Sequence, residues 1–140
     1  MTATFELRIL TPEHTFYQGR VEMLTVQAQD GKTCIWAGYA PTVIALAEGE
    51  LILRDAGRSE KRAAASDGFM TVTQDQTVVM LQSAEWPEDI DRVRAERAER
   101  RAREALLHKQ DRQSHLMNQA MLLRAMTRLR VSDRRKVNHT

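Results

Sequence analysis

The residues most able to carry chemistry in this chain of 140 residues are charged groups near its C-terminal end. Asp91, Arg94 and Ala95 stand at i, i+3 and i+4, so a helix would place them on one face. Arg124 and Arg128 are also one helical turn apart, and two guanidinium groups at this spacing can offer bidentate contacts to an anionic group. The alternative is structural: Asp91 caps a helix or pairs with Arg94, and the two arginines face an acidic protein surface.

No arrangement typical of an enzyme accompanies these residues. The hydroxyl residues lack a partnering histidine and carboxylate, and no glycine-rich loop is followed by Lys and Ser or Thr. The single Cys34 excludes an internal disulfide and a cysteine metal cluster. We therefore expect no catalytic residue, no metal site and no required cofactor, because the four histidines also lack metal-ligand spacing: His14, His108, His115 and His139.

Charge is unevenly distributed along the chain. Residues 1–84 hold 7 basic and 10 acidic residues, whereas residues 85–140 hold 14 and 9. The excess lies at the end, since residues 85–112 hold 8 of each and residues 113–140 hold 6 basic residues and 1 acidic residue. A basic helix is attracted to acidic protein, phosphate or anionic lipid, and less strongly as salt rises.

The elements that position these residues change at the segment 83–95. Pro87 is excluded from the interior of a helix or a central strand, and the acidic residues after it favour a helix N-terminus, with Asp89 as the expected cap. We expect a β domain over residues 1–85 and a helical domain with a basic tail over residues 86–140. No run of 18 apolar residues and no signal segment occur, so we expect a cytoplasmic chain that does not insert into a membrane.

Short apolar or alternating runs separated by Gly, Pro and Asp occupy the first domain. They predict many strands with hairpin turns and no intervening helix, which fits an antiparallel sandwich or flattened barrel. The overall fold class is an all-β N-terminal domain followed by an α-helical hairpin. The expected strands cover residues 5–10, 15–21, 23–28, 34–36, 41–47, 50–55, 58–66, 69–73 and 76–82.

After Asp89 the apolar period becomes helical. Two helices of about 20 residues, each about 30 Å long, are expected to form an antiparallel hairpin with a turn at residues 109–111. The second helix is expected to begin at Arg112 or Ser114 and to end near Val131. The first helix repeats small apolar residues that let another helix approach closely: Val93, Ala95, Ala98, Ala102, Ala105 and Leu106.

The second helix carries more apolar surface than one partner requires. Two neighbouring stripes favour two partners, and flexible methionines suit a helix that changes partner. The alternative is that both stripes pack on the first helix and the β domain. One stripe is Leu116, Ala120, Leu123 and Thr127, the other is Leu122, Met126 and Leu129, and Met117 and Met121 lie between them.

Along nearly its whole length the sequence resembles the epsilon subunits of bacterial F-type ATP synthases. The resemblance rests on LRILTPEHTFYQGRVEMLTV, DGKTCIWAGYAPTVIAL, DGFMTV, AEWPEDIDRVRAERAERRA and LLRAMTRLRV in this order and spacing. The chain departs from the family where a leucine, proline, glycine and histidine are usual, and near an aromatic residue and a glycine. The departing residues are Trp36, Ala37, Gly38 and Tyr39, and Thr33 and Cys34.

The resemblance implies a non-catalytic rotor component on the cytoplasmic face of the bacterial cell membrane. Its β domain would bind the gamma subunit and rest on the c-subunit ring. In an extended state its second helix would enter the alpha/beta catalytic hexamer and block ATP hydrolysis, through contacts that include Arg124, Arg128 and Arg130. In a contracted state the hairpin would fold against the β domain.

The resemblance also implies ATP as a regulatory ligand rather than a substrate. The stretch from Ile90 to Ala95 resembles the motif by which some bacterial epsilon subunits bind ATP. Carboxylates and small apolar groups would accept the adenosine, and an arginine pair would contact phosphate. The residues implied are Glu85, Ile90, Asp91, Arg94, Ala95, Arg101, Arg124 and Arg128.

A nucleic-acid-binding module that uses the basic C-terminal helix is the alternative function. Its difficulty is that the β domain is acidic and that no aromatic residues alternate with the arginines. Trp36 and Trp86 both lie outside the basic helix. We therefore expect no nucleic-acid partner.

Overall fold

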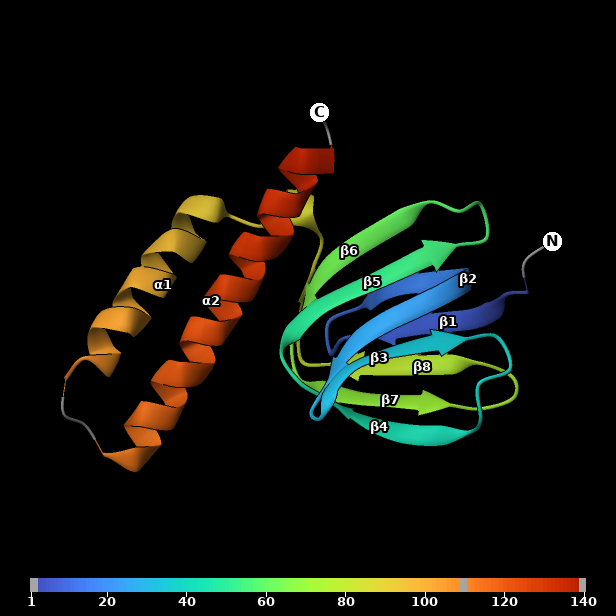
Figure 1. Cartoon of the computed structure of the whole chain (residues 1–140), viewed down its shortest axis with the longest axis horizontal. Coiled ribbons are helices and arrows are strands. Elements are labelled where there is room, and N and C mark those ends of the chain that lie inside the picture. Colours follow the sequence, from blue (N-terminus) through green and yellow to red (C-terminus); the bar gives the residue numbers. More distant parts are fainter. Residues whose placement is uncertain (1–2, 109–110, 139–140) are drawn as a thin grey trace. The chain divides into compact units, whose positions relative to one another are not determined.

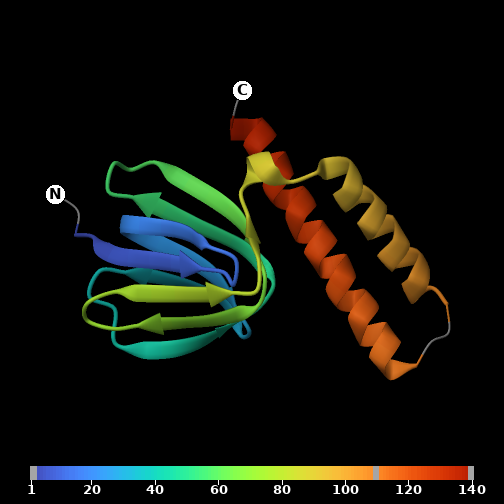
Figure 2. The same ribbon diagram turned by 180° about the vertical axis from the view of Figure 1, so that it is seen from behind.

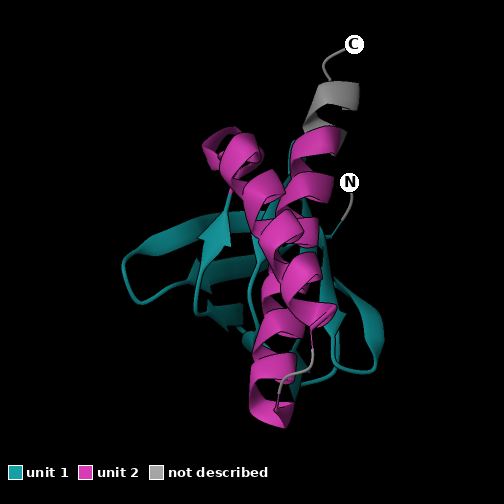
Figure 3. Ribbon diagram, turned by 90° about the vertical axis from the view of Figure 1, so that its left-hand side faces the viewer, with its two compact units in different colours: residues 1–85 teal, residues 86–140 magenta. Residues whose placement is uncertain are grey.

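The structure, a computed structural model, describes the backbone of residues 3–108 and 111–138 and the side chains up to Asp133. It divides into two compact units, residues 1–85 and residues 86–140, here called the β unit and the helical unit (Figure 3). Strands form the first and helices form the second, as the change in sequence pattern after Ser83 predicts (Figure 1).

In the part of the chain that the structure describes, nine strands hydrogen-bond into one sheet that folds into two layers (Figures 1 and 2). Adjacent strands follow the order β1-β8-β7-β4-β2-β5-β6-β9, and β3 pairs with β2 outside this path. The strands are β1 (Phe5–Leu10), β2 (Thr15–Ala28), β3 (Gly31–Trp36), β4 (Thr42–Leu46), β5 (Gly49–Asp55), β6 (Glu60–Ala65), β7 (Gly68–Val72), β8 (Thr77–Leu81) and β9 (Ala84–Glu85).

Strand β2 belongs to both layers. Its first half pairs with β1, where Phe5 is opposite Val21, and its second half pairs with β3 and β5. A single bridge between Ala28 and Leu46 joins it to β4. This 14-residue strand was expected as two strands on either side of Glu22. The pairing with β5 does shift register between Val21 and Met23, so the irregularity is real, but it is a bulge within one strand.

Two other strand predictions need correction. The sheet is not wholly antiparallel, because β1 and β8 pair in parallel, from Leu7 opposite Thr77 onward. These strands are distant in sequence, so no tight hairpin forces them to run in opposite directions. The short strand β9 was not predicted, because two residues carry no period, and β6 begins at Glu60 because Arg58 occupies the preceding turn with φ 66°.

The core of the β unit consists of inward-facing aliphatic residues from alternate positions of the strands. In β1, for example, Leu7 and Ile9 are fully buried while Glu6 and Arg8 are not. Alternation of this kind places one face of each strand against the opposite layer. The largest fully buried side chains are Leu7, Ile9, Leu24, Ile35, Leu51, Leu53, Met70, Val21 and Val79.

The helical unit begins with one turn of 3-10 helix, Pro87–Asp89, followed by α1 (Arg92–Leu106) and α2 (Arg112–Asn138). The helices lie side by side and antiparallel (Figure 2). Their lengths, 15 and 27 residues, differ from the 20 expected for each. Helix α2 continues past Val131 through polar residues that show no apolar period. Of the expected turn at residues 109–111, only Asp111 is among the described residues.

The expected N-cap of the first helix is wrong. Asp89 lies in the 3-10 turn, and Ile90 is extended, with φ −81° and ψ 122°. Asp91 caps α1 instead. Asp111 has the same role in α2, since its Oδ1 accepts a hydrogen bond from the Ser114 backbone N–H at 2.7 Å.

Among the residues that the structure describes, no helix combines the length and the apolar character needed to cross a bilayer.

Candidate functional site in the helical hairpin

The first turn of α1 is organised by Asp91. Its Oδ1 accepts a hydrogen bond from the Arg94 backbone N–H at 3.1 Å, and its carbonyl accepts one from the Ala95 N–H at 3.0 Å. Asp91 therefore precedes the helix. The spacing had predicted instead that it lies on one helical face with Arg94 and Ala95. The cap satisfies an N–H group that has no partner inside the helix. A carboxylate here also gains from the helix dipole.

The contact between the helices runs along the small residues of α1. Ala95 and Ala102, two turns apart, are almost fully buried, and Ala98, Ala105 and Leu106 are half-buried. This confirms the alanine stripe except at its first member, since Val93 is 57% exposed. Alanines at a helix contact allow the backbones to approach closely.

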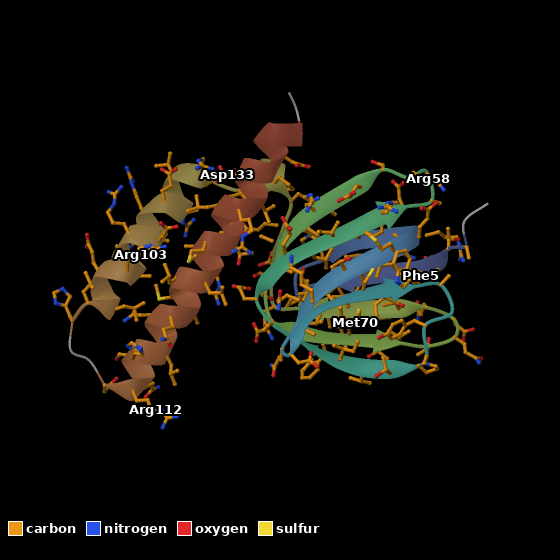
Figure 4. All side chains as sticks on the ribbon, viewed as in Figure 1. Phe5, Arg58, Met70, Arg103, Arg112 and Asp133 are labelled. Atoms are coloured by element: carbon orange, nitrogen blue, oxygen red, sulfur yellow. The ribbon has the colours of Figure 1, made fainter. Side chains whose placement is uncertain are left out.

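Two contacts fix how the helices align. The Arg103 Nη2 atom donates to the Met126 sulfur at 3.8 Å, and the Arg92 guanidinium pairs with the Asp133 carboxylate. Figure 4 labels Arg103 on α1 and Asp133 near the far end of α2. One flank of the hairpin is thus defined by Arg92 and Arg103 on α1 and by Met126 and Asp133 on α2.

Charges on this paired flank compensate one another. Arg92 also pairs with Glu96 at 3.1 Å, and Arg103 pairs with Glu99 at 3.4 Å, both at i,i+4 spacing. Exposed pairs of this kind stabilise a helix by only a few tenths of a kcal/mol each. Their larger effect is to leave little net charge on this side of the hairpin.

The other flank carries four arginines. Arg94 and Arg101, seven residues apart, share the side of α1 opposite Arg92 and Arg103. On α2, Arg124 and Arg128 lie about half a turn from Met126 and therefore also away from the paired flank. These four predicted residues, two from each helix, are here called the basic flank, because all of them are turned away from the paired flank.

The remaining predicted site residues are placed differently. Ile90 lies in the extended link before α1, and Ala95 is only 2% exposed. Glu85 is half-buried on β9, opposite Ala64, and belongs to the β unit. Arg130 is two residues from Arg128, which turns it by about 200° around α2. Arg124, Arg128 and Arg130 therefore do not share one face.

The two apolar stripes of α2 have different surroundings. Leu122, Met126 and Leu129 are half-buried, and Met126 contacts α1, so this stripe packs within the hairpin. In the other stripe Thr127 is buried, and its hydroxyl donates to the Leu123 carbonyl at 2.8 Å. Among the α2 side chains that the structure describes, four large apolar ones are exposed and are here called the outer α2 strip: Leu116, Met117, Met121 and Leu123.

The paired flank was not anticipated from the sequence. The ion pairs within α1 could have been predicted, because Arg92 with Glu96 and Glu99 with Arg103 are i,i+4 pairs of opposite charge. The contacts between the helices could not, because a contact from Arg92 to Asp133 depends on how the two helices align. The structure describes no group of three or more His, Cys, Asp or Glu residues that is placed to hold a metal ion.

The β unit has an exposed apolar surface of its own. Ala45, Phe69 and Met80 are neighbours across β4, β7 and β8, and Val43 lies two residues before Ala45. All four are exposed and are here called the outer β patch. Beside it opens a cavity of about 480 Å³, whose lining includes Leu10 and Pro12 as well as Phe69 and Met80.

Two family descriptions match the chain and meet near the boundary between its units. ATP synthase, Delta/Epsilon chain, beta-sandwich domain matches residues 4–87. ATP synthase, Delta/Epsilon chain, long alpha-helix domain matches residues 88–133. Together they define a two-part delta or epsilon chain of an ATP synthase.

Curated relatives give the same family over nearly the whole length. The chain is 39% identical over 134 residues to the ATP synthase epsilon chain of Caldicellulosiruptor saccharolyticus, covering 96% of this chain and 97% of that one. It is 36% identical over 129 residues to that of Bacillus velezensis, covering 92% and 97%. The chain belongs to the epsilon-chain family of ATP synthases. It is a non-catalytic subunit of the central stalk.

Solved structures share the fold. A chain of the Euglena gracilis mitochondrial ATP synthase matches with a TM-score of 0.80 at 22% identity, covering 91% of this chain and 80% of that chain. A chain of the Tetrahymena thermophila mitochondrial ATP synthase central stalk and c ring matches with a TM-score of 0.64 at 12% identity, covering 94% and 98%. Neither the relatives nor these structures support the alternative of a nucleic-acid-binding module.

Proposed function

We propose that this subunit links the gamma subunit to the c ring through its β unit and inhibits ATP hydrolysis through its helical hairpin, with ATP as a ligand that favours the contracted state. The site of action is the cytoplasmic face of the bacterial membrane, where the chain is a peripheral part of the synthase. The observation that carries the proposal is that four large apolar side chains of α2, the outer α2 strip, stay exposed when the hairpin is folded.

The outer β patch supports the attachment to the rotor. Contiguous exposed apolar residues on a soluble domain mark interaction sites more often than chance exposure. Phe69 and Met80 lie next to each other across β7 and β8 and project beside the cavity, so together they offer an apolar anchor and a recess. The gamma subunit or the c ring would cover this surface in the assembled stalk.

Inhibition requires α2 to bind elsewhere in the extended state. Its exposed leucines and methionines would pack against the alpha/beta hexamer, and its arginines would meet acidic groups there. Because Arg130 points away from Arg128, these positions test different contacts. We expect Arg124→Ala/Arg128→Ala to relieve inhibition of ATP hydrolysis in a reconstituted complex, and Arg130→Ala to have a separate effect.

The measurement compares hydrolysis by complexes that contain equal amounts of each variant. Arg97→Ala/Arg100→Ala is the matched control, because it removes the same two charges from exposed α1 positions outside the basic flank. Unchanged hydrolysis with the double variant still incorporated would count against an inhibitory role for Arg124 and Arg128.

ATP binding uses the same flank in the contracted state. Arg94 and Arg101 of α1 and Arg124 and Arg128 of α2 would each offer a guanidinium group to the ligand, and Asp91 lies at the start of α1. Four guanidinium groups can satisfy a triphosphate by charge-assisted hydrogen bonds. Only the closed hairpin brings both helices to one ligand, so ATP shifts the population by its preference for that state.

Calorimetric titration of the isolated chain with ATP tests this part. We expect Arg128→Ala to weaken binding by about tenfold or more, because a charge-assisted contact contributes roughly 1.5–3 kcal/mol. Asp91→Asn separates the two roles of Asp91, since asparagine keeps the cap and loses the charge. No binding by the parent chain up to millimolar ATP, or full binding by both variants, would exclude the clamp.

A further inference from the structure

The methionines of this chain differ widely in solvent exposure. Met70 is 0% exposed in the core of the β unit, whereas Met117 and Met121 on α2 are 59% and 45% exposed. Met126, on the α1 side of the same helix, is half-buried, and its sulfur accepts a hydrogen bond from Arg103. Met80, in the outer β patch, is 48% exposed. One helix therefore holds both accessible and shielded thioethers.

Met117 and Met121 are one helical turn apart within the outer α2 strip. Leu116 and Leu123 are exposed on the same helix about a third of a turn away, so the two thioethers form one edge of the exposed apolar surface of α2. A thioether in such a surface packs as an aliphatic group until it is oxidised, and then becomes a strong hydrogen-bond acceptor. The strip would change from apolar to polar without any change in charge.

We propose that Met117 and Met121 form a peroxide-sensitive modification site that controls the docking of the outer α2 strip. The oxidant is hydrogen peroxide or an organic hydroperoxide. A sulfur lone pair attacks one peroxide oxygen, the O–O bond breaks, and the sulfur loses two electrons to become a sulfoxide. The proton on the attacked oxygen passes to the departing oxygen, so hydrogen peroxide leaves as water and an organic hydroperoxide as its alcohol, and one peroxide is consumed for each methionine.

The functional consequence rests on the proposed inhibition by the extended hairpin. Docking would bury the two sulfoxide oxygens against an apolar surface, where they lack the hydrogen bonds that water provides. Oxidation therefore weakens inhibition by about tenfold. Reduction by a methionine sulfoxide reductase restores it, because that reaction reverses the first oxidation step.

The first arm of the experiment locates the modification. The full chain is treated with limiting hydrogen peroxide, and the oxygen gained by each peptide is measured by mass spectrometry. We expect Met117 and Met121 to oxidise well before Met126, and Met70 to stay reduced in the folded chain. Met80 serves as an exposed reference. Oxidation of Met80 while Met117 and Met121 stay reduced overturns the proposal.

The second arm measures inhibition of ATP hydrolysis in the reconstituted complex before and after oxidation, with incorporation checked by co-purification. The matched variant is Met117→Leu/Met121→Leu. The inhibition of ATP hydrolysis by this variant after peroxide treatment is compared with its own inhibition before treatment. We expect peroxide to relieve inhibition by the parent chain, and to leave the inhibition by the variant unchanged.

The outcomes separate the two proposals. If the chain carries both sulfoxides, is incorporated and still inhibits fully, the docking role of the two methionines is wrong while the proposed inhibition stands. If the reduced chain does not inhibit at all, the proposed inhibition is wrong and the docking role fails with it. The peptide masses decide the modification itself in either case.

Discussion

Asp91 and Asp111 begin α1 and α2 in the same way. Each carboxylate accepts a hydrogen bond from a backbone N–H three residues later, at 3.1 Å from Arg94 and at 2.7 Å from Ser114. The bond to the Ser114 backbone is also the main reason that the pKa of Asp111 is lowered, followed by the Ser114 side chain. The deprotonated Asp111 side chain therefore stabilises the first turn of α2.

The pH dependence of this cap follows from the direction of the shift. A carboxyl whose pKa is lowered on folding stabilises the folded state above its ordinary pKa of 3.8, and that stabilisation is lost as pH falls through the lower folded pKa. We expect the first turn of α2 to fray over this range. The chemical shift and exchange rate of the Ser114 amide proton measure it.

Asp111→Ala is the informative variant for that titration, and Asp75→Ala is its control. The first should fray the turn at neutral pH and abolish the acid transition of the Ser114 amide. The second removes an exposed aspartate from the loop between β7 and β8 and should leave that transition in place. A Ser114 amide that titrates identically in the Asp111→Ala variant would contradict the assignment.

At the scale of elements, β7 and β8 depend on one glycine. A Cβ atom added at Gly68 would lie 2.0 Å from the Met80 carbonyl oxygen and 3.1 Å from the Leu81 Cα atom. Both are backbone atoms, so the strands must separate to relieve the overlap. We expect Gly68→Ala to lower the free energy of unfolding by about 1–3 kcal/mol, the usual effect of overpacking, as measured by urea denaturation.

Gly57→Ala is the matched control for this substitution. An added Cβ at Gly57 would meet only the Asp55 carboxylate oxygen, at 3.4 Å, which is ordinary contact. Its free energy of unfolding should change by less than about 0.5 kcal/mol, the usual range for surface positions. Equal effects of the two substitutions would show that the approach of β7 to β8 at Gly68 is not tight.

The strands were largely predictable because alternation carries their pattern, as in Leu7 and Ile9 of β1. The pairing of the strands was less predictable, because the parallel contact of β1 with β8 depends on how the two layers of the sheet come together. The start of α1 was ambiguous, since Asp89 and Asp91 both suit a cap, and the extended backbone at Ile90 decides between them.

The candidate site, too, was predictable from the sequence only in part. The spacing of Arg124 and Arg128 placed them together on α2, but their position opposite the paired flank follows only from the contacts of Arg103 and Arg92. The excess of basic residues in this segment did not show that Arg130 lies on a different face of α2 from Arg124 and Arg128. Exposure of Met117 and Met121 was equally hidden, because the sequence placed them between two apolar stripes without showing which stripe faces α1.

At the scale of the molecule, the β unit has its own core and its own closed network of strand pairs. We expect residues 1–85 to fold without the helical unit and to unfold cooperatively, because the core side chains from Leu7 to Val79 all belong to it. Circular dichroism during thermal unfolding of this fragment measures it. An unfolded fragment would mean that the β unit needs the helices for stability.

The shared strand β2 has a consequence for how the β unit opens. Its backbone N–H groups bond to β1 on one stretch and to β3 and β5 on the next, so neither layer can peel away without disrupting the other. Local fluctuations should therefore leave the middle of β2 intact. We expect its amide protons to exchange with deuterium only when the whole β unit unfolds, and thus to report its global stability directly.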